Sequence, residues 1–295
     1  MVRRQPALAI ESSASIRVFG LNLDFASLSR AIDAEPSVTH RAGDRGPTSR
    51  PYSTDLWCLD SPLPRSDPLG AHLLWLSKRL GPYYSFLRGL KQTAEVRSFC
   101  GIIADGAECN LRLSPAAFRL FTDLDVQMEL SLIFGAEDLP RPSLRDREEL
   151  PQGGPTGPYR TESQVHLVAR GHDLDGGPIS PGLGIQSLRI SPRGEIEAAA
   201  EVGDSWSLLV PVGRQDKLDQ HLRWLGSFLS RHADFIRSQS KGRELAIHCA
   251  FETSSEMGGV DISSEALRLP VELGLVLSID VRLLRGGWPT FGGVG

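Results

Sequence analysis

The sequence has few of the residues and none of the short motifs that mark common classes of enzyme and metal protein. Its 295 residues include four cysteines, and no two of these form a C-x-x-C pair. The seven histidines include no pair at metal-ligand spacing. The chain also lacks the phosphate-binding motif G-x-x-x-x-G-K-[ST], the nucleophile motif G-x-S-x-G and the zinc motif H-E-x-x-H. We therefore expect no metal and no cofactor, and an enzyme would need catalytic residues gathered from distant segments.

The charge and the apolar runs of the chain exclude two further classes of partner. A formal net charge of −4 gives no sign of the basic surface that nucleic acids require. No run reaches the roughly 18 apolar residues that cross a membrane. The opening stretch MVRRQPALAIESSASIRVFG is interrupted at Glu11 and does not read as a signal peptide. The sequence thus predicts a cytoplasmic protein that binds neither nucleic acid nor membrane.

The cysteines fall in segments that favour burial. Cys100 lies in VRSFCGII and Cys249 in LAIHCAF, and both runs are apolar and typical of strands. A reactive cysteine needs a partly exposed site near positive charge. We therefore interpret the cysteines as reduced core residues.

One amphipathic segment occurs twice in the chain. The stretch DPLGAHLLWLSKRL at residues 67–80 is similar to DKLDQHLRWLGSFL at residues 216–229, and the two are offset by 149 positions. A constant offset over a long span indicates a duplicated domain, since each unit is too long for a solenoid repeat. The same offset relates three pairs outside this segment: Trp57 and Trp206, Cys100 and Cys249, and Ser114 and Ser263.

The duplication and the composition together predict two domains joined by a linker. The first repeat spans residues 14–135 and the second residues 164–285. Residues 136–163 are dense in proline, glycine and charge, as expected of a linker, and residues 286–295 form a glycine-rich tail. Each repeat is long enough to bury a core of its own, and a pseudo-two-fold axis would relate the two.

Each repeat reads as strand, helix, strand, helix, strand, strand, helix, strand. AEVRSFCGIIAD and CNLRL read as two strands that a turn at Asp105 and Gly106 joins. In the repeated long helix, Asp67 suits the N-cap and Pro68 the first helical position, and Asp216 is the cap of the second copy. This order, with hairpins as well as crossovers, predicts an α+β fold in which helices pack on one side of a mostly antiparallel sheet.

Several short patterns of the first repeat resemble a known family, a bacterial domain of unknown function numbered 4279. They are G-x-x-L-D at 20–24, a helix that ends before Pro36, G-D at 43–44, D-x-W at 55–57 and D-x-L-x-x-H-x-x-W-L at 67–76. The resemblance covers nearly the whole chain as two copies, and the second copy departs from it where Glu195 stands for Asp44. It implies a compact bacterial α+β module whose gene neighbours often encode toxins and immunity proteins. It brings no catalytic residues.

The repeated histidines are the first candidates for a binding site. His72 and His221 occupy equivalent helical positions, and Trp75 and Trp224 lie one turn further along the same flank. Histidine is the side chain that titrates near neutral pH. If the two copies pack about a two-fold axis, the two pairs could meet. The alternative is that each His and Trp lies at the edge of a core with its polar tip hydrogen-bonded.

A second candidate site consists of charged residues near the first helix. Arg41 and Asp44 lie in a predicted loop, and Asp55 and Asp204 each precede a strand tryptophan by two positions. Together they could line a polar pocket. The alternative is that they are solvated at loop edges. Asp24, at the start of the first helix, is explained as an N-cap.

Three functions remain open. The first is a binding protein that acts by occupying a protein partner, for example an immunity protein that neutralises a toxin, which requires a surface and no catalytic set. The second is a sensing module that binds a small ligand between the two repeats. The third is an enzyme of unrecognised class.

Overall fold

The computed structural model describes residues 10–46, 50–135, 161–171, 183, 190–191, 204–239 and 244–284, with the backbone alone for residues 171, 190–191 and 204–206. We call residues 10–135 the first half and residues 161–284 the second half. Most of the predicted linker and the whole predicted tail lie outside the described residues.

The first half contains β1 (Ile10–Gly20), α1 (Phe25–Ile32), β2 (Val38–His40), β3 (Asp55–Asp60), α2 (Leu69–Leu80), the 3-10 helix η1 (Gly81–Tyr83), α3 (Tyr84–Leu90), β4 (Glu95–Ala104), β5 (Glu108–Leu113), α4 (Pro115–Leu124) and β6 (Met128–Phe134). The second half contains β7 (Thr161–Gly171), β8 (Ile190–Ser191), β9 (Asp204–Leu209), α6 (Leu218–Ser230), α7 (Ala233–Gln239), β10 (Glu244–Thr253), β11 (Met257–Ile262), α8 (Ser264–Leu273) and β12 (Val276–Leu283).

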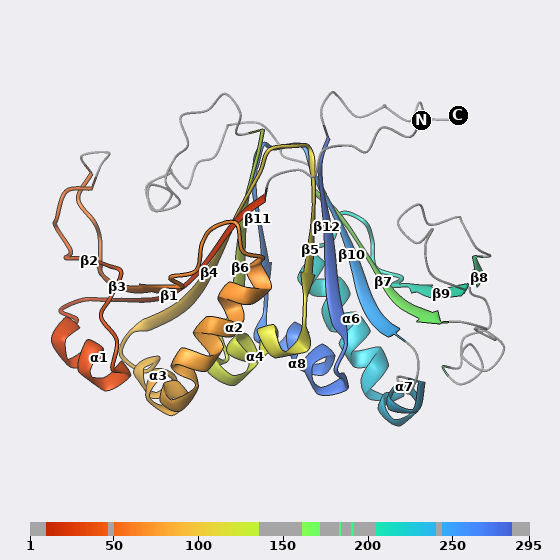
Figure 1. The fold of residues 1–295 in the computed structure, drawn as a ribbon, viewed down its shortest axis with the longest axis horizontal. Coiled ribbons are helices and arrows are strands. Elements are labelled where there is room, and N and C mark those ends of the chain that lie inside the picture. The colour runs from red at the N-terminus through yellow and green to blue at the C-terminus, as the bar shows by residue number, and fades with distance from the viewer. Residues whose placement is uncertain are drawn as a thin grey trace.

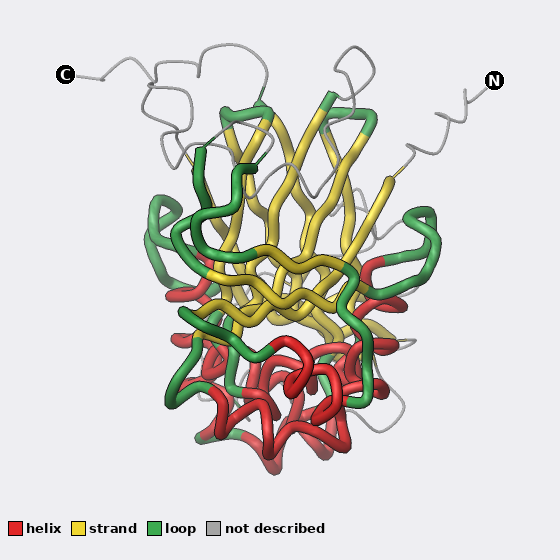
Figure 2. The backbone as a smooth tube through the Cα atoms, turned by 90° about the vertical axis from the view of Figure 1, so that its left-hand side faces the viewer, coloured by secondary structure: helices red, strands yellow, loops and turns green. Residues whose placement is uncertain are grey.

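The strands form two six-stranded sheets. The first sheet has the order β11-β6-β4-β1-β3-β2 and the second the order β5-β12-β10-β7-β9-β8. Neighbouring strands are antiparallel except in the pairs β4–β6 and β10–β12. The helices gather at one end of the molecule, opposite the connection between β4 and β5 (Figures 1 and 2). The prediction of an α+β fold with mostly antiparallel sheets is confirmed. Within the described ranges, no helix combines the length and the apolar character that a membrane crossing requires.

Each sheet contains one strand from the other half of the chain. β5 of the first half pairs with β12 along the edge of the second sheet, from Leu113 opposite Leu277 to Glu108 opposite Arg282. β11 of the second half pairs in the same way with β6 of the first sheet. The strands on either side of the turn at 105–107 were predicted correctly, but the hairpin between them was not, because β4 and β5 belong to different sheets.

The alternation of side chains explains why sequence reasoning could not find this exchange. In β5, Cys109, Leu111 and Leu113 are buried and the residues between them are exposed. This alternation of buried and exposed residues shows that β5 has one covered face and pairs with a neighbouring strand. Pairing with β4 or with β12 would produce the same alternation. The exchange therefore changes the partner of β5 without changing its pattern.

One hydrophobic core runs through both halves. Leu73 and Phe118 of the first half and Leu222 and Leu267 of the second belong to the same cluster of buried residues. α2 packs on α4, α4 on α8, and α8 on α6, so that α4 and α8 form the centre of the helical layer (Figure 1). The halves thus share a core, whereas we had expected each to bury its own. Whether a duplication produced them stays a prediction.

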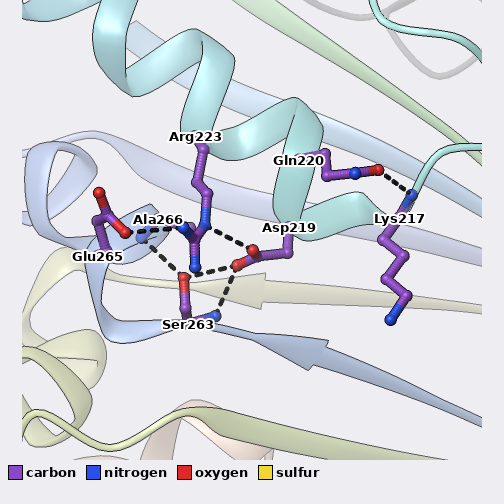
Figure 3. A network of polar contacts seen from close by, with 7 residues as sticks. All are labelled: Lys217, Asp219, Gln220, Arg223, Ser263, Glu265 and Ala266. Atoms are coloured by element: carbon purple, nitrogen blue, oxygen red, sulfur yellow. Dashed lines mark hydrogen bonds and ion pairs between the residues drawn. The ribbon is translucent and has the colours of Figure 1, made fainter.

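A polar network fixes the start of α6 against the start of α8 (Figure 3). Asp219 accepts hydrogen bonds from the backbone N–H of Ser263 at 2.8 Å and from its hydroxyl at 2.7 Å. Arg223 donates to Asp219 at 2.7 Å and forms an ion pair with Glu265 at 2.9 Å. The Ser263 hydroxyl in turn caps α8 by accepting from the N–H of Ala266. The first half has Gly70 at the position of Asp219, so this network exists in the second half alone.

The helix starts differ in part from the predicted ones. Asp24 caps α1 as predicted, accepting from the N–H of Ser27 at 3.0 Å. α2 has Pro68 as its N-cap residue, and α6 has Lys217, so that neither Asp67 nor the equivalent Asp216 occupies the cap position. The reason is that these N-cap residues are themselves extended, with ψ near 146° and 144°, which delays each helix by one residue.

We expect residues 10–135, expressed alone, to form a homodimer in which β5 of each copy completes the sheet of the other. An isolated copy would leave the edge of β6 unpaired and the apolar face of β5 uncovered. Size-exclusion chromatography with light scattering should give twice the mass of the fragment. Leu111→Lys, on the buried face, should abolish the dimer, whereas Arg112→Ser, on the exposed face, should not. A folded monomer would contradict the prediction.

Candidate functional site

The charged residues of the loop before β3 converge on one carboxylate. Asp55 is 3% exposed. It accepts hydrogen bonds from the backbone N–H of Leu23 at 2.8 Å and of Ala42 at 2.8 Å. Nη1 of Arg41 lies 2.9 Å from the same carboxylate. Asp55 therefore joins the entry to α1 and the loop after β2 to the start of β3.

The neighbouring polar groups are also bonded within this loop. The backbone N–H of Arg41 donates to Asp44 at 2.8 Å, and Nη1 donates to the carbonyl of Leu23 at 2.6 Å. The guanidinium lies over the ring of Phe25, 3.8 Å from its centroid. The bond from the Ala42 N–H, followed by those from Leu23 and Arg41, holds the pKa of Asp55 below its usual value. The structure thus brings Arg41, Asp44 and Asp55 together, and their contacts fix the loop.

The fourth charged candidate cannot be placed in the same way. Asp204 begins β9 and its backbone pairs with Gly171 of β7. Its side chain lies outside the described residues.

The two repeated histidines are buried in separate surroundings. His72 on α2 and His221 on α6 are each 1% exposed. α4 and α8 lie between the two helices, so the histidines do not face one another (Figure 1). Trp75 and Trp224 pack at the edge of the core, and the ring of Trp224 stacks on Phe228 with centroids 5.3 Å apart. The tryptophans thus have the core-edge position that was the alternative to a binding role.

The hydrogen bonding of the two histidines differs. Nε2 of His221 lies 3.1 Å from the carbonyl oxygen of Gly213. The ring of His72 interacts with the backbone of Pro64 and Asp67, the positions equivalent to Gly213 and Asp216, but neither of its nitrogens reaches full hydrogen-bond geometry. The buried hydroxyl of Ser61 has no hydrogen-bond partner among the described residues. Burial lowers the pKa of both histidines, so His72 is a neutral imidazole with one donor and one acceptor. An unbonded buried polar group costs stability and calls for an explanation.

His72 and Ser61 line the same cavity, which has a volume of about 260 Å³. It lies between the loop that joins β3 to α2 and the polar side of β1. We call it the His72 cavity. Its other lining residues are Ser13, Ser15, Arg17, Ser37, Asp60, Pro62, Leu63, Arg65 and Phe99. Sequence reasoning found His72 but missed the rest, because they come from separate segments that only the packing of β1, β3 and α2 brings together.

The face of the first sheet that points away from the helices continues from this cavity. Arg17 on β1 lies over the ring of Phe99 on β4, 4.0 Å from its centroid, and Arg97 lies 5.5 Å from that of Phe19. Arg97 also forms ion pairs with Glu95 at 2.7 Å and with Glu129 at 3.9 Å. We call this surface the outer face; it consists of Ser13, Ser15, Arg17, Phe19, Glu95, Arg97, Phe99 and Glu129.

A larger hollow of about 760 Å³ lies at the other end of the outer face. Phe19, Leu21, Arg97 and Glu129 are among its lining residues, and Leu21 is 69% exposed. Burial raises the pKa of Glu129, although the nearby Arg97 opposes the shift. The outer face is thus a strip of stacked Arg and Phe side chains with a hollow at each end.

The cysteines are buried thiols, as predicted. Cys58, Cys100, Cys109 and Cys249 are all buried and unpaired. Burial raises the pKa of Cys58 and of Cys109 to about 12, and raises the pKa of the other two as well. A thiol that stays protonated near neutral pH is a poor nucleophile. Within the described ranges, no group of three or more His, Cys, Asp or Glu side chains is arranged to hold a metal ion.

Residues 10–135 match a family described as "Domain of unknown function (DUF4279)". The matched range contains β1 to β6, and with them the His72 cavity and the outer face. The resemblance of the second half stays a prediction. No curated protein matches the chain.

We expect Asp55→Asn to lower the melting temperature by several degrees at pH 7, because two backbone N–H groups and Arg41 lose a charged acceptor. Since the pKa of Asp55 is lowered by folding, its contribution is complete well above pH 4 and is lost as the pH falls through the folded value. Calorimetry between pH 7 and pH 3 should show the two melting temperatures converging. Asp44→Asn, which affects one exposed bond, is the control and should have a smaller effect.

We expect His221→Leu to destabilise the protein by about 1–3 kcal/mol and His72→Leu to cost much less. The first change removes the partner of the Gly213 carbonyl, whereas the contacts that the second removes, with the backbone of Pro64 and Asp67, fall short of full hydrogen-bond geometry. Urea unfolding of the two variants measures the difference. Equal destabilisation would show that His72 is hydrogen-bonded in solution.

Proposed function

We propose that the chain is a binding protein without catalytic activity, and that it acts by occupying a protein partner through the outer face. The observation that carries the proposal is the pair of Arg–Phe stacks, Arg17 on Phe99 and Arg97 on Phe19. Aromatic residues and arginine are enriched in protein interfaces and contribute most of the binding energy there. Side chains already held by stacking lose little further freedom when a partner binds.

The shape and charge of the outer face support a protein partner. The exposed Leu21 offers an apolar contact beside the hollow, whose lining is otherwise mostly polar and charged and suits polar side chains of the partner. Acidic and basic groups alternate there, with Glu95 and Glu129 flanking Arg97. Alternating charges select a partner by complementarity more than they add affinity. This pattern favours a specific protein over a uniformly charged polymer.

A toxin is one partner that fits this mode of action. An immunity protein neutralises its target by covering it, which requires a surface and no catalytic group. Support for this narrower role comes from the gene neighbourhood that the family resemblance implies. We also propose that the protein is bacterial and that it acts in the cytoplasm.

The test is capture from the native host followed by reconstitution with the purified partner. Arg97→Glu should weaken the complex by about 30-fold or more, because it reverses the central charge and removes a stack. Arg112→Glu is the matched control, since Arg112 is an exposed, ion-paired arginine on β5 in the second sheet. Titration calorimetry measures both affinities. Equal affinity of the two variants for the partner would refute the outer face as the binding surface.

A further inference from the structure

We propose that the pairing of β6 with β11 is a pH-sensitive junction, in which loss of the proton of Glu129 loosens the strand that the second half contributes to the first sheet. This inference goes beyond the proposed function, because it concerns the joining of the two halves and requires no partner. We call this pairing the β11 junction and the pairing of β5 with β12 the β5 junction. The register of the β11 junction sets Glu129 of β6 directly opposite Asp261 of β11. Side chains of opposite residues point to the same face of the sheet, and like charges there weaken the pairing.

The positive charges near the two carboxylates compensate them only in part. Arg97 on β4 lies 3.9 Å from the carboxylate of Glu129 but 2.7 Å from that of Glu95. Arg17 on β1 adds a weaker attraction for the ionised form of Glu129. Asp261 is exposed, and within the described part of the chain it forms no ion pair. The repulsion across the β11 junction is therefore not cancelled by a salt bridge to Asp261.

Burial adds to the cost of ionising Glu129, whose side chain is 25% exposed. Loss of solvent, and more weakly the charge of Asp261, raise the pKa of Glu129, while Arg97 and the hydrogen bond from Gln127 oppose the shift. A carboxyl group whose pKa is raised by folding favours the folded state at low pH. This contribution is lost as the pH rises through the folded value. The β11 junction is therefore most stable where Glu129 carries its proton.

The β5 junction shows that the fold does not require two carboxylates at this position. The offset of 149 residues places Ser278 where the β11 junction has Glu129, and Arg112 where it has Asp261. Ser278 and Arg112 are likewise opposite one another in the register. A hydroxyl beside a guanidinium brings no repulsion, and Arg112 is ion-paired with Glu244. The repelling pair is thus a property of the β11 junction and not of the exchange of strands as such.

The first test is thermal unfolding of the full chain at pH 7.5 and pH 4.5. Glu129→Gln and Asp261→Asn should each raise the melting temperature at pH 7.5 by about 1–3 °C, because each removes one charge of the repelling pair. The increase for Glu129→Gln should shrink at pH 4.5, where most of the wild-type carboxyl is protonated. Glu95→Gln is the matched control, since it deletes the same charge on the same face but breaks an ion pair, and it should not raise the melting temperature. No increase for Glu129→Gln or for Asp261→Asn at pH 7.5, or an undiminished increase for Glu129→Gln at pH 4.5, would overturn the proposal.

Hydrogen exchange locates the effect within the structure. At pH 7.5 the backbone amides of β11 should exchange about twofold or more slowly in Glu129→Gln than in the wild type, because exchange requires the junction to open. The amides of β5, at the other junction, should exchange at the wild-type rate. Equal slowing in β5 and β11 would show an effect on the whole molecule and overturn the assignment to the β11 junction. Since no partner protein enters these measurements, their failure is distinguishable from a failure of the outer face.

Discussion

The exchange of β5 and β11 is the constraint on which the rest of the structure depends. An unpaired strand edge is prone to pair with another chain, and β6 and β12 here each find their outer neighbour in the other half of the chain. The same exchange places α4 against α8 and makes one core from two halves. Asp125, at the end of α4, accepts a hydrogen bond from the hydroxyl of Ser264 at the start of α8, which ties the halves together at the surface as well.

β1 has one face in the core and the other on the surface. This strand lies in the interior of the first sheet between β3 and β4, and Ala14, Ile16 and Val18 point toward the helices. The alternate positions carry Arg17 and Phe19 to the outer face, where β4 supplies their stacking partners. One strand therefore contributes both to the core and to the outer face that we propose binds a partner. The rigid packing of the core holds the side chains of the outer face in place.

The two halves resemble each other in topology but differ in their polar detail. The second half uses Asp219 to join α6 to α8 and Gly213 to satisfy His221. The first half has Gly70 and Pro64 at these positions, and His72 lines a polar cavity beside the backbone of Pro64 and Asp67. The repeated helix is thus held by different polar contacts in the two halves.

The sequence by itself determined the α+β class, the burial of the cysteines, the cap at Asp24 and the main strands and helices of the first half, although it did not predict β2, η1 or α3. All of the features that it determined depend on local periodicity and backbone preference. It also brought Arg41, Asp44 and Asp55 into one group. Only the tertiary structure decided which sheet β5 joins, that α4 and α8 separate the two histidines, and that His72 shares a cavity with Arg17 and Ser61. The physical reason is that strand pairing and cavity lining depend on contacts between residues distant in the chain, and an alternating strand carries the same pattern whichever neighbour it finds.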